Sequence, residues 1–188
     1  SQALGPTHLA WMFMREAPES WPKPSLPDLW FTYRTNPAIA FWQTDYLLET
    51  IAQMPFVVAF AYVQDETNHM ADILLPEATD LEGTQLIRCG GTKFIEQAWD
   101  YRGVVLRQPV VAPQGQARDF TWIATELARR TGLLEPYIQR LNKGAALVPL
   151  KNEHGDFRLP SDRVPEVDEI WDAVCKAATA ELSEGAEI

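Results

Sequence analysis

The feature that most constrains the fold is a run of apolar residues, Phe56 to Val63, in the first half of the 188-residue chain. Its hydrophobicity is continuous and does not alternate, which is typical of a central parallel strand that is buried on both faces. The run is far shorter than the roughly 20 apolar residues that a membrane-spanning helix needs. It therefore predicts the middle strand of an open parallel sheet.

The segments on either side of this run favour a strand–helix–strand unit. Residues 29–33 are β-prone, and residues 44–54 carry apolar side chains at helical spacing. Thr44 is placed to cap that helix, and Pro55 ends it. A further short strand is expected at residues 71–76.

Later segments continue the alternation of strands and helices. We expect β structure with glycine turns over residues 86–113, followed by a helix over residues 119–131. Asp119 stands at the start of that helix, and Gly132 follows its end. The fold class predicted for residues 28–135 is α/β: a three-layer, open, mostly parallel sheet with flanking helices, similar to half of a Rossmann or flavodoxin fold.

The two ends of the chain differ from this middle part. Residues 1–27 hold a short apolar patch followed by closely spaced prolines, and we interpret them as a partial N-terminal segment of a truncated domain. Residues 136–188 are expected to form a mixed extension. Its clearest element is an amphipathic C-terminal helix over residues 167–182.

Composition and motifs exclude several classes of function. Lys and Arg number 16 and Asp and Glu 26, so the net charge is −10, and we expect no nucleic-acid partner and no direct membrane insertion. The histidines lie in unrelated contexts, and Cys89 and Cys175 match no metal-binding or disulfide spacing. Phosphate-loop and nucleophile-elbow motifs are absent from the sequence. Taken by itself, the chain carries no catalytic constellation and no metal site.

The loops after two predicted strands are better candidates for a binding site. Residues 34–37 and 64–67 offer backbone N–H groups and short polar side chains, and ligands of open α/β sheets bind beyond the carboxyl ends of the strands. Asn36-Pro37 could equally be a plain turn, and residues 65–67 a plain helix start. The residues alone leave both interpretations open.

A set of motifs in a fixed order resembles the molybdopterin oxidoreductases of the dimethyl sulfoxide reductase family over residues 28–135. The motifs are Asn36-Pro37-Ala38, Glu66-Thr67, residues 71–79 (ADILLPEAT), Leu81-Glu82, residues 114–119 (QGQARD), Trp122 and residues 128–132 (ARRTG). The form Pro76-Glu77-Ala78-Thr79 is more similar to the branch of polysulfide, thiosulfate, tetrathionate and arsenate reductases and of phenylacetyl-CoA oxidoreductases than to formate dehydrogenases.

The resemblance implies a cofactor and a context. Members of the family bind two molybdopterin guanine dinucleotides with molybdenum or tungsten, and their third domain holds the guanosine end of one of them. The chain is then a fragment that is inactive alone, its partners being the remaining domains of the same enzyme and an iron–sulfur electron-transfer subunit. An iron–sulfur cluster and the metal ligand would lie elsewhere. Substrate, electron acceptor and compartment stay open.

The resemblance also implies cofactor-binding residues, which are Asn36, Phe60, Ala61, Glu66, Thr67, Gly83 and Asp119. Asn36 would contact the nucleotide, Phe60 and Ala61 would line it with backbone, and Glu66 and Thr67 would lie at its edge. Gly83 would approach the cofactor closely. Asp119 would accept hydrogen bonds from guanine N1–H and N2–H₂. For Asp72 and Glu82 a local hydrogen bond at a strand end or cap is an equally open interpretation.

One departure and two alternatives accompany the resemblance. The family has glycine two residues before Asn-Pro, where this sequence has Arg34, which could reach a phosphate itself or displace the turn. A scaffold domain of an iron–sulfur subunit, as in respiratory complex I, keeps the fold without binding pterin. Asn36, Glu66-Thr67 and Asp119 favour the cofactor-binding function over the scaffold. A flavodoxin-like module that folds by itself is the more distant alternative.

Overall fold

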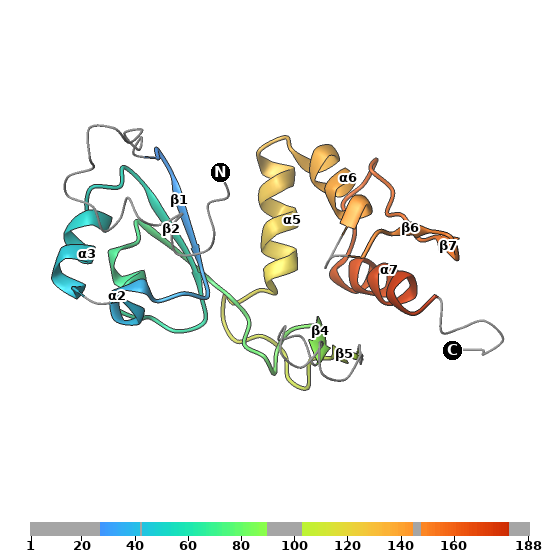
Figure 1. The fold of residues 1–188 in the computed structure, drawn as a ribbon, viewed down its shortest axis with the longest axis horizontal. Coiled ribbons are helices and arrows are strands. Elements are labelled where there is room, and N and C mark those ends of the chain that lie inside the picture. The colour runs from blue at the N-terminus through green and yellow to red at the C-terminus, as the bar shows by residue number, and fades with distance from the viewer. Residues whose placement is uncertain (1–26, 42, 90–102, 145–147, 181–188) are drawn as a thin grey trace, which may run out of the picture. The chain divides into compact units, whose positions relative to one another are not determined.

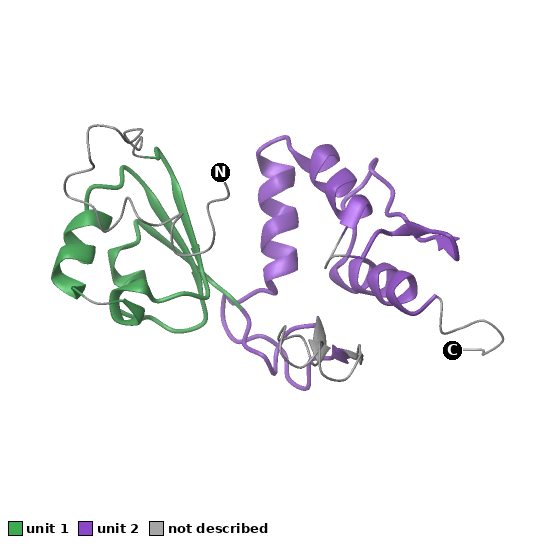
Figure 2. Cartoon of the chain, in the orientation of Figure 1, with its two compact units in different colours: residues 1–77 green, residues 78–188 purple. Residues whose placement is uncertain are grey.

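The computed structural model describes residues 27–41, 43–89, 103–144 and 148–180. The chain divides into two compact units, residues 1–77 and residues 78–188 (Figure 2). Each unit has its own hydrophobic cluster. The domain boundaries expected from the sequence, after residues 27 and 135, stay predictions.

The described part of the first unit is built on a parallel sheet of three strands, β1 (Trp30–Tyr33), β2 (Val57–Ala61) and β3 (Ile73–Pro76), with β2 in the middle (Figure 1). Thr32 of β1 pairs with Ala59 of β2, which pairs with Leu74 of β3. Every residue of β2 is buried. The central parallel strand and the α/β class predicted from the apolar run are therefore confirmed.

Strand β2 is shorter than the apolar run that predicts it. Phe56, Tyr62 and Val63 lie outside the strand, and their side chains are 39%, 49% and 60% exposed. The neighbouring strands explain this limit, because β1 ends opposite Phe60 and β3 ends opposite Ala61. Among the described residues, no strand continues beside Tyr62 and Val63 to bury them.

Two helices connect β1 to β2. Helix α2 (Pro37–Ala40) follows β1 closely, and α3 (Thr44–Ile51) packs Leu47 and Ile51 against Trp30 at the start of β1. The apolar spacing thus correctly predicts a helix here, although it ends at Ile51 and not at Met54.

The predicted cap of α3 is wrong. Gln43, with a left-handed backbone at φ 62°, is the N-cap residue, and Thr44 is the first residue of the helix. The hydroxyl of Thr44 donates instead to the carbonyl oxygen of Ala38 at 2.8 Å. Thr44 therefore lies one position inside the helix, and its hydroxyl links α3 back to α2.

The described residues of the second unit form short antiparallel pairs and three helices. Strands β4 (Gln85–Cys89) and β5 (Gly103–Arg107) pair with each other, as do β6 (Lys151–Asn152) and β7 (Gly155–Asp156). The helices are α5 (Phe120–Arg130), α6 (Leu134–Gly144) and α7 (Val167–Thr179). The glycine turn expected at Gly90-Gly91 lies outside the described residues.

Helix α5 begins and ends as the sequence predicts. Oδ1 of Asp119, the N-cap residue, accepts a hydrogen bond from the backbone N–H of Thr121 at 2.7 Å. Gly132 follows the C-cap residue Thr131 with φ 74°, a left-handed conformation that glycine adopts without strain.

Helix α6 has no counterpart among the predicted elements. Pro136 falls in its first turn, where a missing backbone N–H costs nothing, so the proline does not interrupt the helix. Ile138 of α6 joins Leu150, Leu159 and Val174 in the hydrophobic cluster of the second unit. The extension expected over residues 136–188 therefore contains a packed core.

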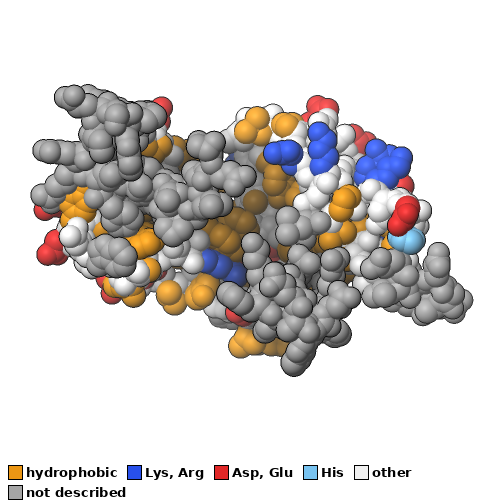
Figure 3. Space-filling view, viewed as in Figure 1, with side chains coloured by type: hydrophobic (Ala, Val, Ile, Leu, Met, Phe, Trp, Pro, Cys, Tyr) orange, Lys and Arg blue, Asp and Glu red, His pale blue; other side chains and the backbone are white. Residues whose placement is uncertain are grey.

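The described surface also exposes apolar side chains, visible in orange in Figure 3. The most exposed are Val110 at 73%, Ile39 at 65% and Leu81 at 62%. Within the described ranges, no helix has the length and apolar character needed to cross a membrane.

Candidate functional site

Three of the predicted site residues meet in the first unit. The side-chain amide of Asn36 donates to Oε2 of Glu66 at 2.7 Å, and the hydroxyl of Thr67 donates to Oδ1 of Asn36 at 2.7 Å. Asn36 follows β1, and Glu66 and Thr67 follow β2. Since β1 and β2 are parallel neighbours, their carboxyl ends lie at the same edge of the sheet.

Thr67 also holds the start of α2. Its hydroxyl accepts a hydrogen bond from the backbone N–H of Ala38 at 3.0 Å, a group that the helix itself cannot pair. Thr67 and Ala38 are both fully buried. The Thr67 hydroxyl therefore holds both the side chain of Asn36 and the first turn of α2 in place.

The network stabilises the ionised form of the Glu66 carboxyl. The hydrogen bond from Asn36 lowers the pKa of the Glu66 carboxyl below its usual range, and a backbone hydrogen bond adds to the effect. Glu66 is exposed, so its carboxylate is ionised at neutral pH and meets solvent. It can accept further hydrogen bonds from a ligand.

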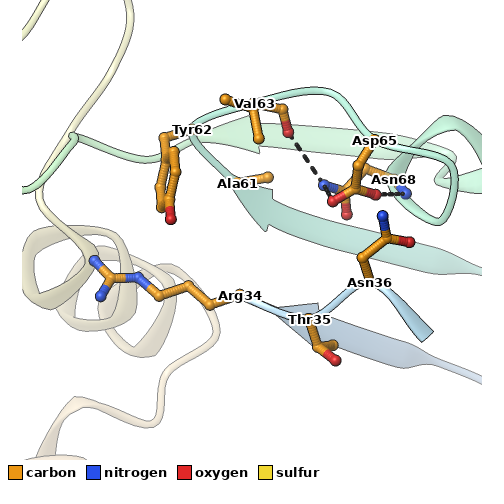
Figure 4. A pocket seen from close by; sticks show the side chains of 8 residues that line it. All are labelled: Arg34, Thr35, Asn36, Ala61, Tyr62, Val63, Asp65 and Asn68. Carbon is orange, nitrogen blue, oxygen red and sulfur yellow. Dashed lines mark hydrogen bonds between the residues drawn. The ribbon is translucent and has the colours of Figure 1, made fainter. Parts of the chain in front are cut away.

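A cavity of about 160 Å³ opens beside this network (Figure 4). Residues from the ends of β1 and β2 and from the loop after β2 line it, namely Arg34, Thr35, Asn36, Ala61, Tyr62, Val63, Asp65 and Asn68. Whole ligand sites usually measure roughly 300–1,000 Å³, so this cavity has room for part of a nucleotide and not for a dinucleotide. Its backbone groups, amides and carboxylate are the donors and acceptors that a sugar or base requires.

Hydrogen bonds hold the part of the cavity lining that follows β2, formed by Val63, Asp65 and Asn68. The side-chain amide of Asn68, which begins the short 3₁₀ helix η2 (Asn68–Met70), donates to Oδ2 of Asp65 at 2.9 Å and to the carbonyl oxygen of Val63 at 3.2 Å. The backbone N–H of Asn68 donates to Oδ1 of Asp65 at 2.8 Å. Both oxygens of the Asp65 carboxylate are thereby oriented.

The predicted site residues of this unit differ in their position relative to the cavity. Asn36 and Ala61 line the cavity. Glu66 and Thr67 are not lining residues, but both form hydrogen bonds with Asn36. Phe60 is buried in the sheet, and its ring packs against Phe31 at a centroid distance of 5.6 Å.

Sequence reasoning missed Tyr62, Val63 and Asn68 as lining residues. For Tyr62 and Val63 the available signal was their position directly after the end of β2. It was obscured because Tyr62 and Val63 extend the apolar run that predicts β2.

Arg34 lies in the turn directly after β1. Its backbone adopts φ 47°, the left-handed conformation that glycine favours, and its guanidinium pairs with Glu77 at 2.7 Å. An arginine thus occupies the position where the resemblance leads us to expect glycine.

Gly83 and Asp119 belong to the second unit and lie together there. A Cβ atom on Gly83 would stand 2.8 Å from Oδ2 of Asp119, closer than side-chain atoms pack. Gly83 is itself buried. The resemblance implies that Gly83 approaches the cofactor closely. Within this chain, the group that Gly83 approaches closely is the carboxylate of Asp119.

Asp72 and Glu82 each accept hydrogen bonds from backbone N–H groups of this chain. Oδ2 of Asp72 accepts from the backbone N–H of Val57 at 2.8 Å. The Glu82 carboxylate accepts from the backbone N–H groups of Thr79 at 2.7 Å and Gln114 at 3.0 Å, and these bonds lower its pKa. Both side chains join segments that are distant in sequence.

The described residues contain no cluster of histidine, cysteine, aspartate or glutamate that could hold a metal ion. Burial, followed by the nearby charge of Asp172, raises the pKa of the Cys175 thiol on α7, so the thiol stays protonated and unreactive. The side chain of Cys89 lies outside the described residues.

Comparison with known proteins finds one family model and three relatives that match this chain. The family model for molybdopterin oxidoreductase matches residues 15–130. The thiosulfate reductase molybdopterin-containing subunit PhsA of Salmonella typhimurium is 30% identical over 132 residues, which cover 70% of this chain and 16% of that protein. Trimethylamine-N-oxide reductase 1 of Escherichia coli is 28% identical over 140 residues, covering 73% of this chain and 15% of that protein.

A third relative, the probable oxidoreductase YyaE of Bacillus subtilis, is 25% identical over 148 residues, covering 73% of this chain and 20% of that protein. The chain therefore spans at most a fifth of the length of these relatives. The family model covers more than half of the chain and includes Asn36, Thr67, Gly83 and Asp119. The chain belongs to the molybdopterin oxidoreductase family, as its resemblance to the dimethyl sulfoxide reductase group implies.

Proposed function

We propose that this chain serves a molybdenum or tungsten oxidoreductase by binding the guanosine end of a molybdopterin guanine dinucleotide. The observation that carries the proposal is the hydrogen-bonded set of Asn36, Glu66 and Thr67 beside a cavity at the carboxyl ends of β1 and β2. This edge is the usual ligand-binding edge of an open parallel sheet. The family membership supports a molybdopterin cofactor, and its guanine dinucleotide form is part of the proposal.

The residues of the cavity fit one end of such a cofactor. Asn36, whose amide is fixed by Glu66 and Thr67, presents a rigid polar group, and the oriented Asp65 carboxylate can accept from ribose hydroxyls. The small volume matches a single sugar or base. When bound, the cofactor would supply the redox chemistry, while these residues would bind and orient its nucleotide.

Asp119 is proposed as the guanine-selective residue. One of its oxygens, Oδ1, caps α5, and the other, Oδ2, is the acceptor that remains for the N1–H and N2–H₂ groups of guanine. Adenine lacks this pair of donors. The remaining domains of the enzyme and an iron–sulfur electron-transfer subunit are the proposed partners.

Nucleotide titration of the chain tests the proposal. GDP, which carries the guanosine diphosphate part of the cofactor, should bind saturably in isothermal titration calorimetry and at least about tenfold more tightly than ADP. Asn36→Ala, which removes the positioned amide, should weaken GDP binding. A scaffold domain without cofactor predicts no saturable binding of either nucleotide, and that result would exclude the proposed function.

A further inference from the structure

The turn after β1 carries an arginine in a backbone conformation that suits glycine. Arg34 has φ 47°, and a side chain at such an angle is strained because its Cβ crowds the backbone. A strained residue persists only where its surroundings hold it in place. The contacts of the Arg34 side chain therefore indicate what the strain serves.

The first contact is a buried carboxylate. Nη2 of Arg34 donates to Oε1 of Glu77 at 2.7 Å, and Nε donates to Oε1 at 3.1 Å and Oε2 at 3.3 Å. The Glu77 side chain is only 1% exposed, and the Tyr33 hydroxyl also donates to its Oε1 at 3.4 Å. Because a buried charge requires a partner, Arg34 and Glu77 depend on each other.

The pair spans the edge of the sheet that carries the cavity. Arg34 follows β1, and Glu77 follows β3, with β2 between them. The backbone N–H of Glu77 donates to the carbonyl oxygen of Ala61, the last residue of β2, at 3.0 Å. The ion pair thus links the ends of all three strands.

The second contact is a wall of the cavity. The guanidinium carbon of Arg34 lies 5.8 Å from the centre of the Tyr62 ring and 5.3 Å from that of the Tyr33 ring, within the range of cation–π attraction. Figure 4 shows the Arg34 side chain running from the end of β1 toward Tyr62. Arg34 and Tyr62 both line the cavity, and Tyr62 is 49% exposed, so the guanidinium orients a ring that the core does not hold.

We infer that Arg34 is a positioning residue for nucleotide binding: anchored on Glu77, its guanidinium holds Tyr62 as a wall of the cavity. The inference rests on the proposed function for the identity of the ligand. Lysine cannot replace arginine fully here, because an ammonium keeps the charge but not the planar fork or the stack.

The following test distinguishes a role of Arg34 in GDP binding from a role in the stability of the fold. In the double variant Arg34→Gly/Glu77→Gln the backbone strain and the buried charge are both removed, so thermal unfolding should stay close to that of the unsubstituted chain. GDP binding should nevertheless weaken about tenfold. Arg34→Lys should keep the thermal stability and weaken GDP binding by a smaller factor. Arg158→Gln, which breaks an exposed bidentate pair with Asp156 in the second unit, is the matched control and should leave GDP binding unchanged.

A coupling experiment checks that Arg34 acts through Tyr62. In a Tyr62→Ala background, the double variant should change the GDP affinity by less than about twofold, because the ring is already gone. Unchanged GDP affinity in a folded double variant, with Tyr62 present, overturns the inference while leaving the proposed function intact. If the double variant does not fold, Arg34→Lys decides in the same way. An unsubstituted chain that does not bind GDP overturns both.

Discussion

The carboxylate of Asp119 lies against the backbone of Gly83, with Oδ2 2.8 Å from the place that a Cβ atom on Gly83 would take. The other oxygen, Oδ1, accepts from the backbone N–H of Thr121 at 2.7 Å. Asp119 is therefore confined from two sides, by its own helix and by a glycine 36 positions earlier in the chain. The sequence suggests a role for each residue separately but not that one requires the other.

Gly83→Ala should destabilise the second unit by about 0.5–2 kcal/mol, the usual cost of losing an N-cap, because the new methyl group pushes Asp119 off Thr121. Urea denaturation measures the change. Gly144→Ala is the control, since a Cβ there meets no atom within 4 Å. Equal stability of both variants would show that Asp119 can move away at no cost.

Thr67→Val should cost about 1–3 kcal/mol, because valine keeps the shape but leaves the buried N–H of Ala38 and the amide oxygen of Asn36 without their partner. Thr67→Ser keeps the hydroxyl and should cost less. Denaturant midpoints give the comparison, and faster hydrogen exchange at the Ala38 amide in Thr67→Val would locate the effect. A serine variant as unstable as the valine variant would contradict the role of the hydroxyl.

Asp119→Asn should separate capping from guanine recognition. Asparagine caps a helix about as well as aspartate, so stability should change little. A charge-assisted hydrogen bond contributes about 1.5–3 kcal/mol, so GDP binding should weaken roughly tenfold or more. A variant that loses stability but keeps GDP affinity would identify Asp119 as a cap alone.

Glu126 provides a pH-dependent contribution on α5. Hydrogen bonds from Arg129 and Arg130 lower the pKa of its carboxyl from 4.5 to about 2. Since the folded-state pKa is lowered, the contribution is complete above pH 4.5 and is lost as the pH falls toward 2. The difference in Tm between the unsubstituted chain and Glu126→Gln should shrink over this interval, and it should also be smaller at high salt because these side chains are partly exposed. A difference independent of pH would contradict the assignment.

What the sequence could predict was governed by local patterns. The continuous apolar run from Phe56 leaves a central parallel strand as the simplest way to bury both faces, and Asp119 and Gly132 delimit α5 by their own backbone preferences. Helix α6 is not among the predicted elements, and it contains Pro136, a residue that helices tolerate only in their first turn.

The details of the candidate site depend on distances that no local pattern contains. Arg34 and Glu77 are 43 positions apart, and the residues around Arg34 do not indicate that it pairs with a buried carboxylate. The exposure of Tyr62 follows from where the neighbouring strands end, which is a property of the sheet. The ends of two predicted parallel strands indicate the loops that hold Asn36, Glu66 and Thr67, and the family resemblance singles out these three residues. The structure adds the hydrogen bonds that join them.

The most direct test of the account is the location of the nucleotide on the chain. In a titration of the ¹⁵N-labelled chain with GDP, the backbone amides of Thr35, Asn36, Tyr62 and Asp65 should shift saturably, whereas those of α7 should not, because the cavity is lined by the first group. The same titration with ADP should give smaller shifts at equal concentration. Saturable shifts confined to residues 148–180, or no shifts at the ends of β1 and β2, would contradict the proposed binding site.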